Sequence, residues 1–313
     1  MPPLLAIPLF LASLAVTLVA ARMFARRLDR LGVRLGLPEA LIGLLTALAA
    51  DGPEISSALF ALLKGANSVG VGVIVGSNTF NLAAMLGVSG ILAGGVWVSR
   101  QVLLLEGATA AAITVIAVAV LFGWLEPAIS AALAACVIVP YLVILLRARP
   151  AAAPPARARR RSADDPTHHL LALILLDVTL IVAASAGMVQ AAIALGDRWQ
   201  VSRAVLGMLI LAPLTSIPNA LTGVRLGLAR RSTALVGETF NSNTINLAAG
   251  VIVPSLFVSL GALGATAEVQ VAWLVGMTAV TLLMLARRRG IRRPEAWLLI
   301  ALYGGFVATQ LVS

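Results

Sequence analysis

Two carboxylates flank a helix-breaking pair in an otherwise apolar part of the chain. The stretch ADGPEISS covers residues 50–57 and places Asp51, Gly52, Pro53 and Glu54 in consecutive positions. Proline has no backbone N–H, so carbonyl groups one turn upstream lose their helical partner. Carboxylate and carbonyl oxygens gathered at one level are the ligands that a hard cation prefers. The stretch therefore predicts a cation site at a break in a helix.

The same pattern returns in the second half of the chain. The stretch TSIPNAL, around Pro218, parallels ADGPEIS, around Pro53. Each is followed by a second motif, SNTFNLAA from Ser77 and SNTINLAA from Ser242. The distance from the proline to the serine is 24 residues in both cases. Agreement in both sequence and spacing indicates an internal repeat, in which oxygens from both halves meet.

Each of the second motifs also carries a pair of asparagines. Asn78 and Asn81 are three positions apart, as are Asn243 and Asn246. This spacing puts both members of a pair on one face of a helix. The amide oxygens of Asn81 and Asn246 add to the predicted site. Asn78 and Asn243 are secondary candidates, since polar residues between membrane helices also serve as hydrogen-bonding links.

Composition indicates an all-α protein that crosses a membrane many times. Hydrophobic residues make up 60% of the 313 residues, charged residues only 12%, and the mean hydropathy is +1.00. These values exclude a water-soluble domain. The net charge of +10 comes from short basic clusters between apolar runs, which are typical of topology signals rather than of a nucleic-acid surface. The expected partners are the lipid bilayer and small inorganic cations.

Ten apolar stretches are long enough to cross the hydrocarbon, which takes about 20 residues. The predicted spans are 3–22, 37–63, 67–94, 101–123, 127–146, 169–195, 203–228, 233–260, 267–286 and 295–312. A polar, basic linker at 147–169 separates a first five-helix unit, 1–146, from a second, 170–313. Pro53 and Pro218 are expected to break the second and seventh spans.

The distribution of basic residues predicts the orientation. With the linker in the cytoplasm, all of the 23 basic residues except Lys64, Arg198 and Arg203 fall on the cytoplasmic side. The positive-inside rule then places both termini outside. Five spans in each half give the two halves opposite orientations, so the repeat is an inverted one. We expect an integral protein of a prokaryotic cell (inner) membrane.

These two segments, 37–94 and 203–260, resemble the alpha repeats of the cation/calcium exchanger superfamily. The family hallmarks are a Pro-Glu pair in the second and seventh helices and a G-S-N-x-x-[ND] motif in the third and eighth. The resemblance implies a secondary-active antiporter that holds cations between the repeats and releases them by alternating access. It implies exchange of Ca2+ or another cation against Na+ or H+, with no cofactor.

The resemblance also implies a set of ligand positions. The positions are Ala47, Glu54, Ser77 and Asn81 in the first repeat, and Ala212, Thr215, Ser216, Asn219, Ser242 and Asn246 in the second. The chain departs from the family at Asn219, where Glu is usual, at Asn246, where Asp is frequent, and at Asp51, where a hydroxyl residue is usual. Both predicted carboxylates, Asp51 and Glu54, therefore come from the first repeat, which predicts weaker Ca2+ binding.

Several alternatives stay open at this point. The loss of the second-repeat carboxylates also suits a monovalent Na+(K+)/H+ antiporter, or a nontransporting scaffold or sensor of the same fold. Asp177, deep in the sixth span, is either an ion relay or the partner of Arg225 or another buried donor. Glu106 and Glu238 lie in the first two turns of their spans, where a carboxylate complements the helix N-terminus.

The sequence contains no motif for enzymatic chemistry. No Ser/His pair, paired catalytic Asp or His-Glu-x-x-His arrangement is visible, so an intramembrane hydrolase is not expected. Cys136 is the only cysteine, which excludes a disulfide framework within the chain and a thiolate metal site.

Overall fold

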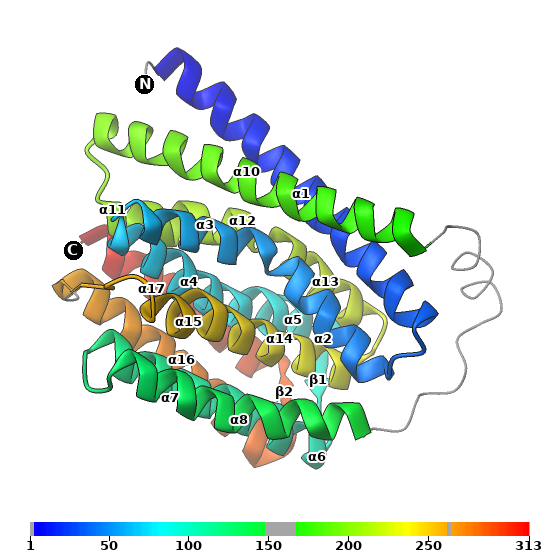
Figure 1. Cartoon of the computed structure of the whole chain (residues 1–313). Helices are drawn as coiled ribbons and strands as arrows, with labels where there is room; N and C mark the ends of the chain where they lie inside the picture. The colour runs from blue at the N-terminus through cyan, green and yellow to red at the C-terminus, as the bar shows by residue number, and fades with distance from the viewer. Residues whose placement is uncertain (1–2, 148–166, 262–263, 313) are drawn as a thin grey trace.

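The computed structural model describes residues 3–147, 167–261 and 264–312, and the described chain is almost entirely helical (Figure 1). Six described helices are long and apolar enough to span a membrane, or seven if one bent pair counts as a span. The count of ten spans therefore stays a prediction, because helices next to a break are only 12 residues long. Most of the predicted linker, 148–166, lies outside the described residues.

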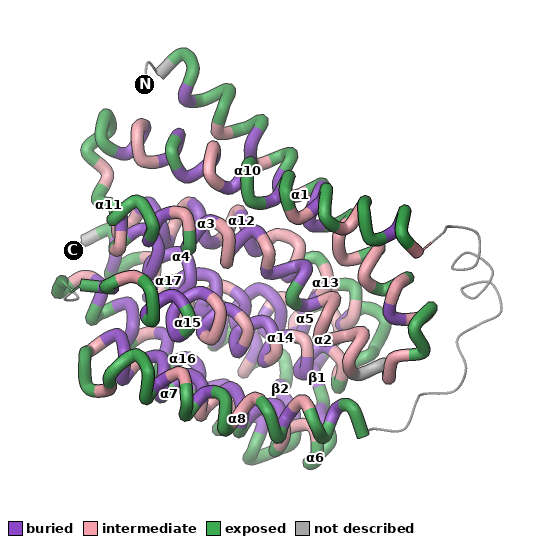
Figure 2. The backbone as a smooth tube through the Cα atoms, viewed as in Figure 1, coloured by how far each residue is buried: buried purple, intermediate pink, exposed green. Residues whose placement is uncertain are grey.

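Two long helices form an outer layer of the molecule. Helix α1 (Pro3–Arg34) and helix α10 (Thr167–Trp199) pack along each other, at the top of Figure 1. Large apolar side chains on their outer faces are exposed, such as Leu4 at 87% and Leu175 at 68%. Figure 2 shows this exposure along both helices. An apolar surface of this kind suits contact with lipid.

The first motif region consists of three consecutive helices. Helix α2 (Glu39–Ala50) ends one residue before helix α3 (Gly52–Leu63), with Asp51 between them. Pro53 lies in the first turn of α3, where its missing N–H has no intrahelical acceptor to lose. Helix α4 (Asn67–Asn81) continues through the π-helix η1 (Leu82–Val88) into helix α5 (Ser89–Ala93). In this last run, 94% of the most apolar window is buried, so it lies at the centre of the molecule.

The second motif region repeats this order. Its elements are α11 (Arg203–Val205), η3 (Leu206–Leu211), α12 (Ala212–Thr215), α13 (Ile217–Leu228), α14 (Ser232–Leu247), η4 (Ala248–Ile252) and α15 (Val253–Ser255). The helical segments before and after Ser216 are bent by 47° relative to each other. A π-helix follows each asparagine motif, η1 after Asn81 and η4 after Leu247. π-helical turns are frequent at functional sites.

The remaining elements cover the opposite face of the central helices (Figure 1). They are α6 (Arg100–Val102), η2 (Leu103–Gly107), α7 (Ala108–Leu121), α8 (Pro127–Arg147), α16 (Ala265–Arg288) and α17 (Arg293–Val312). Two short strands, β1 (Gly95–Trp97) and β2 (Gly290–Arg292), pair antiparallel, with Val96 opposite Ile291. The start of α1 and the end of α17 lie on one side of the molecule, and the end of α8 and the start of α10 on the other (Figure 1).

Candidate cation site

The two predicted carboxylates lie at the junction of α2 and α3 in the interior of the protein. Asp51 and Glu54 are both 0% exposed. Helix α10 covers the junction closely, because a Cβ atom at Gly52 would lie 3.6 Å from the Ile181 side chain. Buried carboxylates are costly unless they are neutralised or paired. The break therefore holds two acidic groups in a place where water cannot solvate them.

Asn219, in the first turn of α13, faces both carboxylates. Its Nδ2 atom lies 2.7 Å from Asp51 Oδ1, 3.1 Å from Glu54 Oε1 and 3.1 Å from Ser242 Oγ. An amide NH2 group has two hydrogens, so it serves at most two of these three oxygens at a time. The partly positive amide thus lies among three oxygens from two helices. Because Glu54 and Asn219 are equivalent positions of the repeat, the two motif regions meet face to face.

Ser242 connects this group to the asparagine motifs. Its hydroxyl donates a hydrogen bond of 2.5 Å to Asp51 Oδ1. The Ser242 Oγ atom also accepts a hydrogen bond from Asn81 Nδ2 at 3.0 Å. Asn81 also donates to Asn243 Oδ1 at 3.2 Å. The hydrogen-bonded residues therefore form a continuous group from the α2–α3 junction to helices α4 and α14.

Asn78 and Asn243 form a reciprocal pair between α4 and α14. Asn78 Nδ2 donates to the Asn243 carbonyl oxygen at 3.0 Å, and Asn243 Nδ2 donates to the Asn78 carbonyl oxygen at 3.1 Å. The two residues are equivalent positions of the repeat, 165 residues apart. Two matching bonds between equivalent residues are what a local two-fold axis requires. These bonds link α4 and α14, which is the hydrogen-bonding role that the sequence analysis gave as the alternative for Asn78 and Asn243.

Several buried oxygens around this group have no hydrogen-bond partner among the described residues. They are Asp51 Oδ2, Glu54 Oε2, Ser77 Oγ, Asn81 Oδ1, Ser216 Oγ, Asn219 Oδ1 and Asn246 Oδ1. A buried polar atom without a partner costs about 1–3 kcal/mol, so a concentration of them in one place calls for an explanation. All seven are oxygens of the kind that coordinate hard cations.

The other predicted positions lie close to the breaks and are buried. The Ala47 carbonyl accepts from the Asp51 amide at 2.9 Å, and the Ala212 carbonyl accepts from the Ser216 amide at 3.0 Å. Thr215 Oγ1 donates to the Leu211 carbonyl at 2.9 Å. These bonds use helical partners, and carbonyl oxygens keep a second lone pair. Their role as cation ligands stays a prediction.

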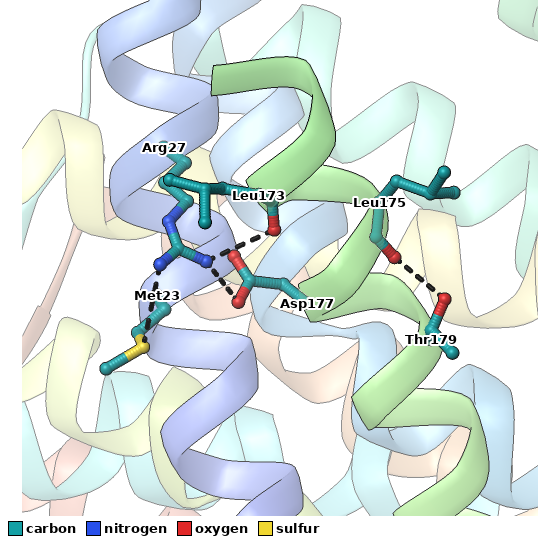
Figure 3. Close-up of polar contacts among 6 residues, drawn as sticks. All are labelled: Met23, Arg27, Leu173, Leu175, Asp177 and Thr179. Atoms are coloured by element: carbon teal, nitrogen blue, oxygen red, sulfur yellow. Dashed lines mark hydrogen bonds and ion pairs between the residues drawn. The ribbon is translucent and has the colours of Figure 1, made fainter. Parts of the chain in front are cut away.

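Asp177 is part of a different contact. Its carboxylate forms an ion pair with Arg27, and Arg27 Nη1 also donates to the Leu173 carbonyl at 3.2 Å (Figure 3). The Asp177 residue is 1% exposed. The donor is thus Arg27 of α1 rather than Arg225. The pair joins α1 to α10 within the outer layer, and no described hydrogen bond connects it to Asp51 or Glu54.

One polar cluster was missed in the sequence. The Tyr141 hydroxyl, on α8, lies within hydrogen-bonding distance of Glu106 Oε2 and of Asn241 Oδ1. Asn241 directly precedes Ser242, and it occupies the position equivalent to Gly76 of the first motif. The polar Asn241 in place of a glycine was the feature of the sequence that could have indicated this cluster. Tyr141 could not be assigned to the cluster from sequence, because it lies 100 residues away from Asn241.

Comparison with known proteins identifies the family of this chain. Two stretches, residues 5–148 and 169–312, match the sodium/calcium exchanger protein family. CaxA of Alkalimonas amylolytica, which is named as an antiporter, is 36% identical over 84 residues, a match that covers 26% of each chain. This chain thus aligns with about a quarter of the length of that curated relative.

Two solved structures share the fold over most of this chain. The sodium-calcium exchanger NCX_Mj superposes with a TM-score of 0.68 at 20% identity, covering 98% of this chain and 99% of that one. The H+/Ca2+ exchanger CAX superposes with a TM-score of 0.81 at 14% identity, covering 98% and 82%. At these identities the similarity shows the fold alone. Since the two family matches span nearly the whole sequence, the chain belongs to the sodium/calcium exchanger family, within the cation/calcium exchanger superfamily.

Proposed function

We propose that this protein is a secondary-active antiporter that exchanges Ca2+ or another cation against Na+ or H+ by alternating access. The observation that carries the proposal is the buried group of oxygens around Asp51, Glu54 and Asn219. Family membership supports it, as do the names of NCX_Mj, CAX and CaxA. The ten spans, their inverted arrangement and the breaks at Pro53 and Pro218 are part of the proposal.

The two carboxylates supply the charge that a buried cation needs. A divalent ion in the interior is stable only next to compensating negative charge. Asp51 Oδ2 and Glu54 Oε2 are buried and have no partner among the described residues. Together the two side chains balance the charge of one Ca2+. The hydroxyl and amide oxygens of both repeats complete an all-oxygen shell.

Asn219 gives the site two states. In the structure its NH2 group faces the carboxylates, while its Oδ1 atom has no partner in the described chain. A half-turn of the amide exchanges the two atoms and presents Oδ1 to an arriving ion. The NH2 group then serves as a neutral substitute for the cation in the unloaded protein. The family's Glu at this position has no such donor.

Two other functions are possible outcomes of the ion-flux experiment described below. A monovalent Na+(K+)/H+ antiporter is favoured by the neutral side chains Asn219 and Asn246 in place of acids. A scaffold or sensor is disfavoured by the buried unpartnered oxygens, because a protein without an ion to bind gains nothing from their cost.

Ion flux into vesicles tests the proposal directly. The purified protein would be reconstituted into liposomes loaded with Na+, or with a pH gradient, and challenged with labelled Ca2+. We expect gradient-dependent Ca2+ uptake, which an ionophore that collapses the gradient abolishes. Labelled Na+ uptake without Ca2+ uptake would support the monovalent antiporter. Absence of flux for every cation would support the scaffold.

The orientation is proposed with both termini outside and the linker in the cytoplasm. Its test is a Cys introduced at Ser162 in a Cys136→Ala background, labelled in intact cells. A membrane-impermeant maleimide should react only after the cells are opened. Labelling from outside would reverse the orientation.

A further inference from the structure

A cavity of about 810 Å³ leads from the protein surface toward the central helices. Its lining includes exposed residues such as Arg230 and the buried residue Glu106. Four polar residues in its wall form what we call the cavity cluster: Glu106, Tyr141, Glu238 and Asn241. They come from η2, α8 and α14, so three separate elements contribute.

Tyr141 holds two members of the cavity cluster together. Its hydroxyl lies 2.9 Å from Glu106 Oε2 and 2.5 Å from Asn241 Oδ1. A tyrosine hydroxyl has one hydrogen, so it donates to one of these oxygens at a time. The Tyr141 hydroxyl thus lies between acceptor oxygens from two other elements, and its one hydrogen can satisfy only one of them.

The carboxylates of the cluster have free coordination capacity. Glu106 is 8% exposed, and its second oxygen has no hydrogen-bond partner in the described part of the chain. Glu238 forms neither a hydrogen bond nor an ion pair with any described residue. Both carboxylates line the same cavity. Asp29, Arg230 and Arg231 are the other charged residues of the lining.

The cluster lies next to the central site. Glu238, Asn241 and Ser242 are spaced three and four residues apart on α14, so they share one helix face. Ser242 donates directly to Asp51 Oδ1. The cavity cluster and the central site are therefore linked through one face of α14.

The first repeat has no counterpart of this cluster. The positions equivalent to Glu238 and Asn241 are Val73 and Gly76. At Gly76 the helices are in close contact, because a Cβ atom there would lie 2.8 Å from the Ala212 Cβ and 2.8 Å from the Met208 carbonyl oxygen. Close packing fills the space that the cavity occupies in the other half.

We propose that the cavity cluster is a second binding site, for a divalent cation, through which ions pass between the cavity and the central site. Glu106, Glu238 and the Asn241 amide oxygen are the ligands, and Tyr141 positions Glu106 and Asn241. Two carboxylates balance the charge of one divalent ion, and all donors are oxygens. The inference rests on the proposed antiport of Ca2+, since it assigns an additional station to the same ion.

Equilibrium dialysis of the purified full-length protein against labelled Ca2+ tests the second site. We expect two Ca2+ ions per chain in the parent and one in the double variant Glu106→Gln/Glu238→Gln. We also expect one in Glu54→Gln, so that each variant keeps the site that the other loses. The matched control is Glu126→Gln/Glu268→Gln, which removes two exposed carboxylates from the lining of another cavity and should keep two ions.

Flux measurements provide a second readout. In vesicles, Glu106→Gln/Glu238→Gln should raise the apparent KM for Ca2+ about tenfold, equivalent to about 1.4 kcal/mol, with a smaller effect on maximal flux. Tyr141→Phe should raise KM by a smaller factor, because the ligands remain but lose their link.

The results separate this inference from the proposed function. One Ca2+ per chain in a parent with normal flux, or an unchanged KM in the double variant, would overturn the second site and leave the antiporter intact. Absence of both binding and flux in the parent would overturn the antiporter, and the second site with it.

Discussion

The two halves of this protein share a backbone plan but distribute their polar groups differently. Each half has a junction between two successive helices, an asparagine motif and a π-helix in the same order. At the breaks, the first half carries Asp51 and Glu54 where the second has Ser216 and Asn219. On the motif helices the difference is reversed, since Glu238 of the second half corresponds to Val73 of the first.

This contrast shows which properties a repeat must keep and which it can redistribute. The backbone has to stay similar, because the reciprocal bonds of Asn78 and Asn243 require matching positions on both sides of the axis. A bound ion, however, responds to the summed charge around it. Carboxylates can therefore move from one half to the other without changing the balance at the centre.

The strongest test of the contrast is Glu54→Gln. The amide keeps the shape of the side chain but removes half of the central negative charge. Breaking the charge balance of a buried ion costs about 3 kcal/mol or more, so flux should fall by more than about 100-fold. Labelled Ca2+ uptake into vesicles measures this, with Glu126→Gln as the control. Unchanged uptake in Glu54→Gln would refute the central site.

A charge transfer between the halves is the next test. Asp51→Ser should reduce Ca2+ flux about tenfold or more, since one carboxylate is lost. Adding Ser216→Asp to it places the carboxylate at the equivalent position of the second half. If only the summed charge matters, the double variant should recover a substantial part of the flux. A double variant as inactive as the single one would show that the position of the charge is decisive.

A third test adds charge to the second half. Asn219→Asp is nearly isosteric but replaces the NH2 donor by a third carboxylate. The unloaded protein should be less stable, while Ca2+ should bind about tenfold more tightly and stabilise the variant more than the parent. Thermal unfolding in detergent with and without Ca2+ measures both effects. Asn219→Ala is the control, because it removes the NH2 donor without adding charge. An equal response to Ca2+ in the parent and both variants would contradict the proposed half-turn of the Asn219 amide.

The smallest expected effect concerns the symmetric part of the contrast. Asn78→Ala removes one bond of the reciprocal pair, whereas Asn243→Ala removes the other bond and also the acceptor of the Asn81 amide. Each lost hydrogen bond should lower the free energy of unfolding by about 0.5–1.5 kcal/mol, so Asn243→Ala should have the larger effect. Unfolding in mixed micelles measures these values. No effect from Asn78→Ala would show that the reciprocal pair does not contribute to stability.

The sequence by itself determined the class of the protein, its family and the segments that build the site. Hydropathy alone separates membrane helices from loops, because a bilayer accepts only long apolar segments. The two proline and asparagine motifs were readable because a repeat leaves similar residues at constant spacing. Asp51 and Glu54 were named from these patterns, Asn219 and Ser242 from the family resemblance, and the structure brings all four into one hydrogen-bonded group.

Only the tertiary structure decided how the polar residues pair. Sequence cannot show that Arg27 is the partner of Asp177, because α1 and α10 come together from distant parts of the chain. The same applies to Tyr141, which joins Glu106 to Asn241 across three elements. Glu106 and Glu238 each suited a helix N-terminus when considered alone. Their position in one cavity wall depends on how η2 and α14 pack, and packing between distant segments leaves no periodic signal in the sequence.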